Sequence, residues 1–105
     1  MQPANILRID TLDESWSDKD NVMLHACFQL LTDCIEKEGL LTHWDWTADQ
    51  RGDVKIELET LYSWWKQRVQ RDQADGIDWI WTPGQHEEDN MMLTRLVKLR
   101  GYLWT

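Results

Sequence analysis

Apolar residues recur with helical spacing in three stretches of the chain, and the first stretch starts near Asp20. Two sets of four apolar side chains, one position apart, repeat there with spacings of four, three and four residues: Met23, Cys27, Leu30 and Cys34, and Leu24, Phe28, Leu31 and Ile35. This spacing predicts a helix with a wide apolar stripe. Asp18 or Asp20 can cap its start, and Gly39 offers a left-handed stop. We therefore expect a first helix over about residues 20–38.

A second stripe with the same period follows after a short linker. It consists of Val54, Leu58, Leu61, Trp65 and Val69. Thr47 and Gln50 fit a capping box, which predicts a helix over about residues 48–71. Gly52 weakens its first turn by about 1 kcal/mol relative to Ala, which favours a proper start at Asp53. Tyr62 and Trp64 lie away from the centre of the stripe, so we expect both to be partly exposed.

The third stripe lies near the C-terminus. It consists of Met92, Leu96, Leu99 and Leu103, follows the acidic residues 87–89 and ends among basic ones. Acids at the start and bases at the end suit the helix dipole, and we expect a helix over about residues 88–103. The final segment, RLVKLRGYLWT, then forms the last turns of a core helix. Gly101 lets the chain turn so that Tyr102 and Trp104 lie against the bundle.

The remaining segments favour irregular structure. Residues 1–19 form an acidic, irregular N-terminal segment, in which residues 5–9 could make a short edge strand. Residues 77–81, IDWIW, could be a short strand or a packed loop. The pattern therefore predicts a mainly α, three-helix bundle-like single domain over residues 1–105, with a minor β element as an open alternative.

Composition narrows the classes of function. The chain has 19 acidic and 11 basic residues and a formal net charge of −8, which argues against direct nucleic-acid binding. Simple solubility explains this charge, and a surface that mimics nucleic acid is the alternative. Eight Trp residues are more than a three-helix core can enclose, so we expect some at the surface, where Trp anchors protein interfaces. No leader or long apolar segment is present, which predicts a cytoplasmic protein without membrane association.

Candidate catalytic chemistry is sparse. The three histidines, His25, His43 and His86, lack the spacing of metal ligands. Cys27 and Cys34 lie about 10 Å apart along a helix, too far for a disulfide, and read as small buried side chains in a reducing compartment. A buried thiol is inert rather than nucleophilic. We expect no enzymatic activity, no metal and no cofactor.

Aromatic and basic residues offer the best candidate binding surface. Such mixtures can anchor a protein partner or stack on nucleobases, although core packing and solvated cations account for most of them. The candidate partner-binding residues are Trp16, Trp44, Trp46, Tyr62, Trp64, Arg68, Arg71, Trp79 and Trp81.

Four segments in this order resemble a family of small tailed-bacteriophage proteins without an assigned activity. They are FQLLTDCIEKEG, WDWTADQR, LYSWWKQR and EEDNMMLTRLVKLRGYLWT, and the resemblance spans about residues 20–105. The linker DQADGIDWIWTPGQH departs from the longer, charged insert of such proteins. The resemblance implies expression in the cytoplasm of an infected bacterium and no particular site residues.

These observations lead to three hypotheses of function. The first is a non-enzymatic phage accessory protein that binds and inhibits a host bacterial protein, for example an anti-CRISPR-like inhibitor of host defence. The second is a homo-oligomeric module that sequesters a nucleotide signal between Trp and Arg side chains. The third is a minor virion or packaging component.

Overall fold

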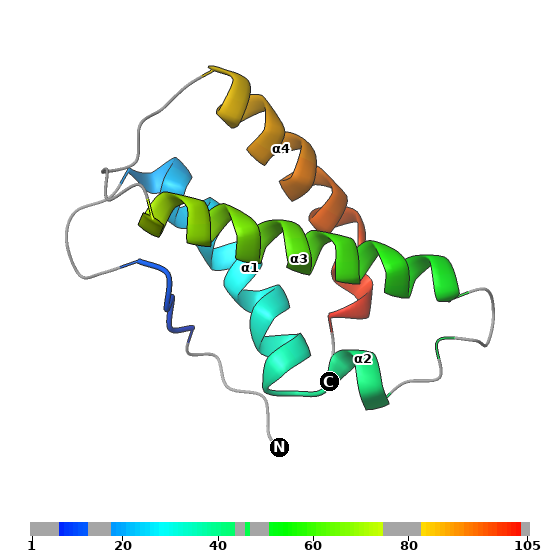
Figure 1. The fold of residues 1–105 in the computed structure, drawn as a ribbon. Helices are drawn as coiled ribbons and strands as arrows, with labels where there is room; N and C mark the ends of the chain where they lie inside the picture. The colour runs from blue at the N-terminus through cyan, green and yellow to red at the C-terminus, as the bar shows by residue number, and fades with distance from the viewer. Residues whose placement is uncertain (1–6, 13–17, 44–45, 47–50, 75–82, 104–105) are drawn as a thin grey trace.

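The structure is a computed structural model that describes residues 7–12, 18–43, 46, 51–74 and 83–103, and every structural statement below concerns these residues. Four helices follow one another: α1 (Lys19–Glu36), α2 (Leu40–His43), α3 (Gly52–Ala74) and α4 (Pro83–Lys98). A 3₁₀ turn, η2 (Arg100–Tyr102), follows α4. The long helices α1, α3 and α4 all pack against one another (Figure 1). The prediction of a mainly α, bundle-like fold is confirmed.

Helix α1 ends near the glycine that the sequence suggests, but its start lacks the expected side-chain cap. Asp18 stands before it in an extended conformation and makes no capping hydrogen bond with its side chain, and the Asp20 carboxylate, inside the first turn, accepts a hydrogen bond from the backbone N–H of the next residue, Asn21, at 2.8 Å. At the other end Gly39 has a φ of 67°, the left-handed conformation that glycine adopts without strain. The backbone N–H groups of Lys37 and Glu38 both donate to the Asp33 carbonyl, which ends the helix at Glu36.

The core lies where the three long helices meet. Its members come from all three predicted stripes, joined by one residue of α2 and one from the linker: Leu24, Phe28, Leu31, Leu40, Trp46, Leu58, Leu61, Trp65, Met92 and Leu96. The Phe28 and Trp65 rings stack with their centroids 4.9 Å apart. Helix α1 does not bury all of its wide stripe, since Met23 and Leu30 are 59% and 49% exposed.

Helix boundaries differ from the expected ones at α3 and α4. Helix α3 begins at Gly52 and continues to Ala74, beyond the expected end at residue 71. Helix α4 begins at Pro83, five positions before the expected start, because proline is well suited to a first helical position that needs no N–H donor. It ends at Lys98, and the tail continues as the η2 turn rather than as α-helix.

The described part of the N-terminal segment packs on α1. The backbone N–H of Asp10 donates to the Gln29 side chain at 3.0 Å, and Thr11 Oγ1 lies 2.6 Å from His25 Nδ1. This segment is therefore irregular, as expected, but residues 10 and 11 are held to the helix. Residues 7–9 adopt no regular secondary structure. Residues 5, 6 and 77–81 of the suggested β element and the Thr47–Gln50 capping box lie outside the described residues. Among the described helices, none has the length and apolar character needed to cross a lipid bilayer.

Candidate functional site

Three polar contacts join α3 to α4 along one line. Arg95 Nε donates to Glu57 Oε2 at 2.8 Å, and a second Arg95 nitrogen bonds the other oxygen of the same carboxylate. The indole N–H of Trp64 donates to Glu88 at 2.7 Å, and Arg71 donates to Gln85 at 2.6 Å. Residue numbers rise on α3 as they fall on α4, so the two helices run antiparallel. We call the surface formed by these six residues and Met91 the α3–α4 seam.

The centre of the seam is apolar. Met91 follows Glu88 by three positions and precedes Arg95 by four, so helical spacing places it on the same side of α4 as these two residues. Its side chain is 55% exposed. Trp64 is half-buried, with its ring centroid 5.3 Å from that of Phe28 and 6.0 Å from that of Trp65. The seam thus combines a flexible thioether with an indole that the core and Glu88 hold in place.

A buried ion pair lies close to the seam. Arg68 and Asp89 are 3% and 5% exposed, with Nε–Oδ1 and Nη2–Oδ2 distances of 3.2 and 3.3 Å. Gln85 donates to the same carboxylate at 2.8 Å and also accepts from Arg71. Buried charges persist in proteins when they are paired and hydrogen-bonded, and this pair meets both conditions. It links the seam to the interior.

Charges at the two edges of α3 are stabilised by their partners. The hydrogen bond from Arg95 lowers the pKa of Glu57, which keeps that carboxylate ionised at neutral pH. On the edge that faces α1, Lys66 lies 2.7 Å from Glu36, and Tyr62 donates to the same carboxylate. The hydrogen bond from Lys66 and then that from Tyr62 lower the pKa of Glu36, while the bond to Glu36 raises the pKa of Tyr62 to about 12.

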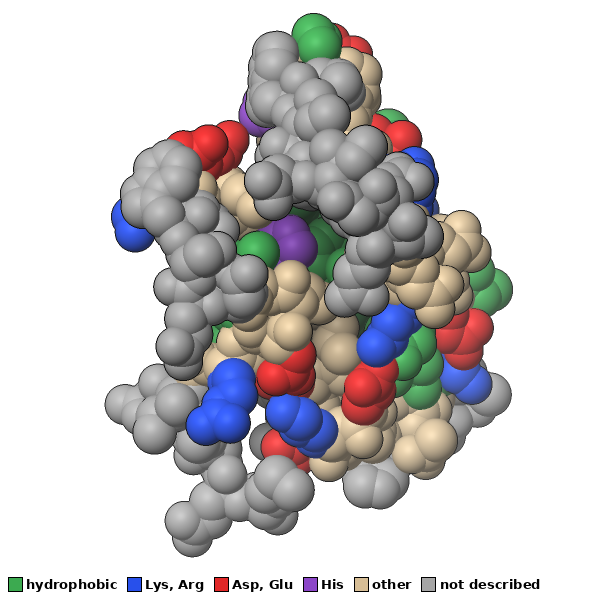
Figure 2. Space-filling model, turned by 60° about the vertical axis from the view of Figure 1, so that its left-hand side comes forward, with side chains coloured by type: hydrophobic (Ala, Val, Ile, Leu, Met, Phe, Trp, Pro, Cys, Tyr) green, Lys and Arg blue, Asp and Glu red, His purple; other side chains and the backbone are tan. Residues whose placement is uncertain are grey.

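Oppositely charged side chains are interspersed on the surface. On the face in Figure 2, basic and acidic side chains lie next to each other. Within the described residues they also form defined pairs, such as Lys66–Glu36 and Arg95–Glu57. A surface of mixed charge attracts the basic groove of a nucleic-acid-binding protein less strongly than a continuous acidic face would.

The candidate partner-binding residues do not form one surface. Trp64 and Arg71 lie on the seam, whereas Tyr62 contacts α1 at the opposite edge of α3. Trp46 is a core residue that donates to the Leu40 carbonyl at 3.3 Å, and Arg68 is buried, so the expected accessible position of both is corrected. Trp16, Trp44, Trp79 and Trp81 lie outside the described residues.

Five residues of the seam escaped the sequence analysis: Glu57, Gln85, Glu88, Met91 and Arg95. Met91 precedes a core residue, Met92, and looks like part of the same apolar run. A helical wheel could have distinguished Met91 from Met92, because the two side chains leave the helix about 100° apart and only Met92 lies on the stripe. The four polar residues among them carry no signal in isolation, because only the antiparallel packing of α3 and α4 brings them to their partners.

His25 is buried, and the two cysteines are half-buried. The rings of His25 and Trp65 meet edge to face with their centroids 4.7 Å apart, and burial together with the nearby positive charge of Arg68 lowers the pKa of His25 to about 4. His25 is therefore neutral at pH 7.

Cys27 and Cys34 are half-buried rather than fully buried, and burial raises the pKa of both thiols. Both thiols are protonated at neutral pH, which makes them weak nucleophiles. Among the described side chains, no group of three His, Cys, Asp or Glu is placed to hold a metal ion.

Fold and seam together define a small, acidic, mainly α protein with an amphipathic surface between two antiparallel helices. No protein-family model, curated protein or solved structure matches the chain at a significant level.

Proposed function

We propose that this chain is a small non-enzymatic bacteriophage protein that binds and inhibits a protein of its bacterial host, and that the α3–α4 seam is its binding surface. The observation that carries the proposal is the exposed Met91, one turn along α4 from Glu88, whose carboxylate accepts the hydrogen bond of the Trp64 indole. Trp, Met and Arg are enriched in the buried centres of protein interfaces. The seam presents all three types within a few turns of helix.

The polar groups of the seam support binding rather than catalysis. Arg95, Glu57 and Glu88 already have partners within the chain, so a bound protein would cover satisfied groups. Preformed contacts also reduce the side-chain ordering that binding requires. The buried Arg68 weakens the alternative of a nucleotide clamp, because its guanidinium is occupied by Asp89 and is not available to stack on a base.

The resemblance to phage proteins supports the host as the source of the partner. A host defence component is the particular target that we propose, with the chain acting as an anti-CRISPR-like inhibitor in the cytoplasm of the infected cell. The net charge of −8 favours a partner with a basic surface, because long-range attraction accelerates the encounter. Binding to such a partner weakens as salt is added.

Affinity capture with two matched variants tests the proposal. Tagged wild-type chain, Met91→Glu and Ile56→Glu are each incubated with lysates of candidate bacterial hosts. Ile56 is the control because it is exposed to a similar extent, 63%, and makes none of the contacts that define the seam. We expect one host protein to be retained by wild type and Ile56→Glu and lost with Met91→Glu, and its activity to be inhibited by the purified chain.

Two other outcomes would contradict the proposal in different ways. Retention of the same protein by Met91→Glu would show that binding uses another surface. Absence of any specific host protein at both low and moderate salt would contradict the function itself. For the defence target, expression of the chain in cells with active CRISPR immunity should restore plaque formation by a targeted phage.

A further inference from the structure

The three methionines that the structure describes have contrasting environments. Met23 and Met91 are 59% and 55% exposed, whereas Met92 is 5% exposed and belongs to the core. Met91 and Met92 are neighbours in the sequence, but their side chains leave α4 about 100° apart. One of two adjacent thioethers is thus open to solvent, and the other is enclosed by the bundle.

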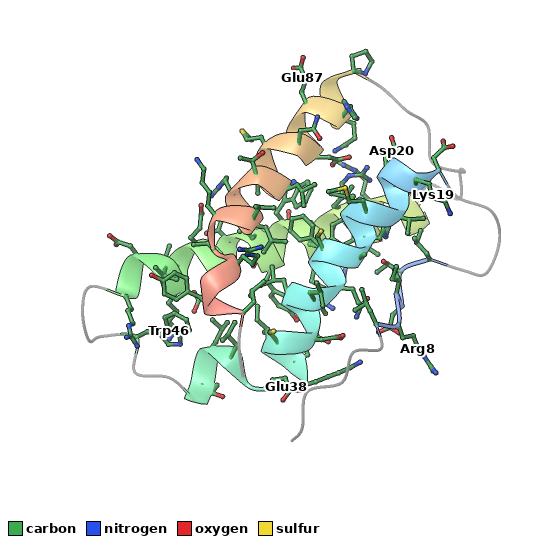
Figure 3. All side chains as sticks on the ribbon, turned by 180° about the vertical axis from the view of Figure 1, so that it is seen from behind. Arg8, Lys19, Asp20, Glu38, Trp46 and Glu87 are labelled. Atoms are coloured by element: carbon green, nitrogen blue, oxygen red, sulfur yellow. The ribbon has the colours of Figure 1, made fainter. Side chains whose placement is uncertain are left out.

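The outward direction of Met91 follows from its place on α4. In Figure 3 the labelled side chain of Glu87 points away from the other helices. Met91 follows Glu87 by four positions, and helical spacing places residues four apart on the same side of a helix. A small oxidant dissolved in water can therefore reach the Met91 side chain without any opening of the bundle.

The sulfur of Met92 is protected in two ways. Arg95 Nη1 donates a hydrogen bond to it at 3.3 Å, and the guanidinium of Arg95 is itself held by the Glu57 carboxylate. This bond occupies a lone pair of the thioether, the group that attacks an oxidant. The second protection is burial, which keeps the oxidant away. Reactivity at this pair of methionines is therefore directed to Met91.

We propose that Met91 is a site of reversible oxidation that controls binding at the α3–α4 seam, an inference that rests on the function proposed above for this surface. The oxidant is hydrogen peroxide. A lone pair of the Met91 sulfur attacks one peroxide oxygen, an S–O bond forms, and the O–O bond breaks. The second oxygen takes up a proton and leaves as water. Sulfur loses two electrons and the peroxide gains two, so thioether and peroxide become sulfoxide and water.

Oxidation changes the chemical character of the centre of the seam. A thioether is flexible and apolar, whereas a sulfoxide is polar. A bound protein would have to bury the new S–O group, which costs free energy unless a donor meets it. The polar contacts of the seam, Arg95–Glu57 and Trp64–Glu88, do not use the Met91 sulfur. Oxidation of Met91 therefore weakens binding and leaves the fold in place.

Graded treatment of the full chain with hydrogen peroxide tests the site without a partner. Tandem mass spectrometry localises the added oxygen, and we expect Met91 and Met23 to react about tenfold or more faster than Met92. Circular dichroism should show the same helix content and melting temperature before and after oxidation of Met91. In urea, which exposes both side chains, Met91 and Met92 should react at similar rates. Equal rates in the folded chain would overturn the proposal, whatever the chain binds.

Affinity measurements with the host protein retained by the wild type test the control of binding. Met23→Leu removes the exposed thioether outside the seam, and peroxide should raise the dissociation constant of this variant about tenfold or more. Methionine sulfoxide reductase should then restore the affinity, because it reduces the sulfoxide and does not repair oxidised Trp or Cys. Met91→Leu is compared only with itself, and its affinity should be the same before and after peroxide.

The outcomes separate this inference from the function on which it rests. Undiminished binding by a chain in which Met91 is fully oxidised would overturn the control of binding and leave the proposed function standing. Loss of affinity in peroxide-treated Met91→Leu would also overturn it, because another residue would then be responsible. If no host protein is retained by the untreated chain, the proposed function fails and the control of binding fails with it, while mass spectrometry still decides whether Met91 is the oxidation site.

Discussion

Replacing either Arg68 or Asp89 alone should destabilise the protein strongly, whereas replacing both together should cost little stability. Asp89→Leu removes the carboxylate that pairs with the buried guanidinium of Arg68. The guanidinium stays charged, because Arg is not deprotonated in proteins. Removing one partner of a buried ion pair costs about 3–5 kcal/mol, a large share of the 5–15 kcal/mol that stabilises a typical domain. Arg68→Met should cost less than Asp89→Leu, because the remaining carboxylate keeps the hydrogen bond that Gln85 donates to it.

The double variant Arg68→Met/Asp89→Leu should recover most of the loss, since apolar side chains of similar size often replace a buried ion pair at little cost. Urea unfolding at pH 7, followed by far-ultraviolet circular dichroism, gives the four free energies of the cycle. The half-exposed pair Arg95–Glu57 is the control, and Glu57→Gln should cost about 0–1 kcal/mol. A double variant as unstable as the sum of the two single variants would refute the reasoning, and so would an Arg68→Met variant less stable than Asp89→Leu.

The remaining predictions concern the core, the pH dependence and the tail. Because folding lowers the pKa of His25 from 6.5 to about 4, its contribution to stability is complete above pH 6.5 and is lost as the pH falls towards 4; urea midpoints at pH 7 and 4.5 should differ less in His25→Gln than in wild type. Leu61→Ala, at a fully buried position, should cost about 2–5 kcal/mol in the same assay. Deletion of residues 102–105 removes the Tyr102 ring, 6.4 Å from that of Trp46, and should lower the melting temperature without affecting seam binding; unchanged melting with loss of the partner would instead make the tail a binding element.

The sequence predicts the helices better than the surfaces because helical periodicity is a local property. The spacing of Leu58, Leu61 and Trp65 is enough to indicate which side of α3 is buried. In α1 two apolar lines of equal strength lie side by side, and only the positions of α3 and α4 decide which of them is covered. Met23 and Leu24 therefore belong to equally apolar lines in the sequence, but in the structure Met23 is exposed and Leu24 is buried.

Arg68 illustrates a different limit of sequence analysis. It follows Leu61 by seven positions and Trp65 by three, so it continues the apolar stripe of α3, and this spacing could have indicated burial. Its charge instead suggested an exposed contact. The compensating residue, Asp89, lies 21 positions away on another helix, and no local pattern links the two. Burial of a charged side chain is a tertiary property, because it depends on a partner that the fold supplies.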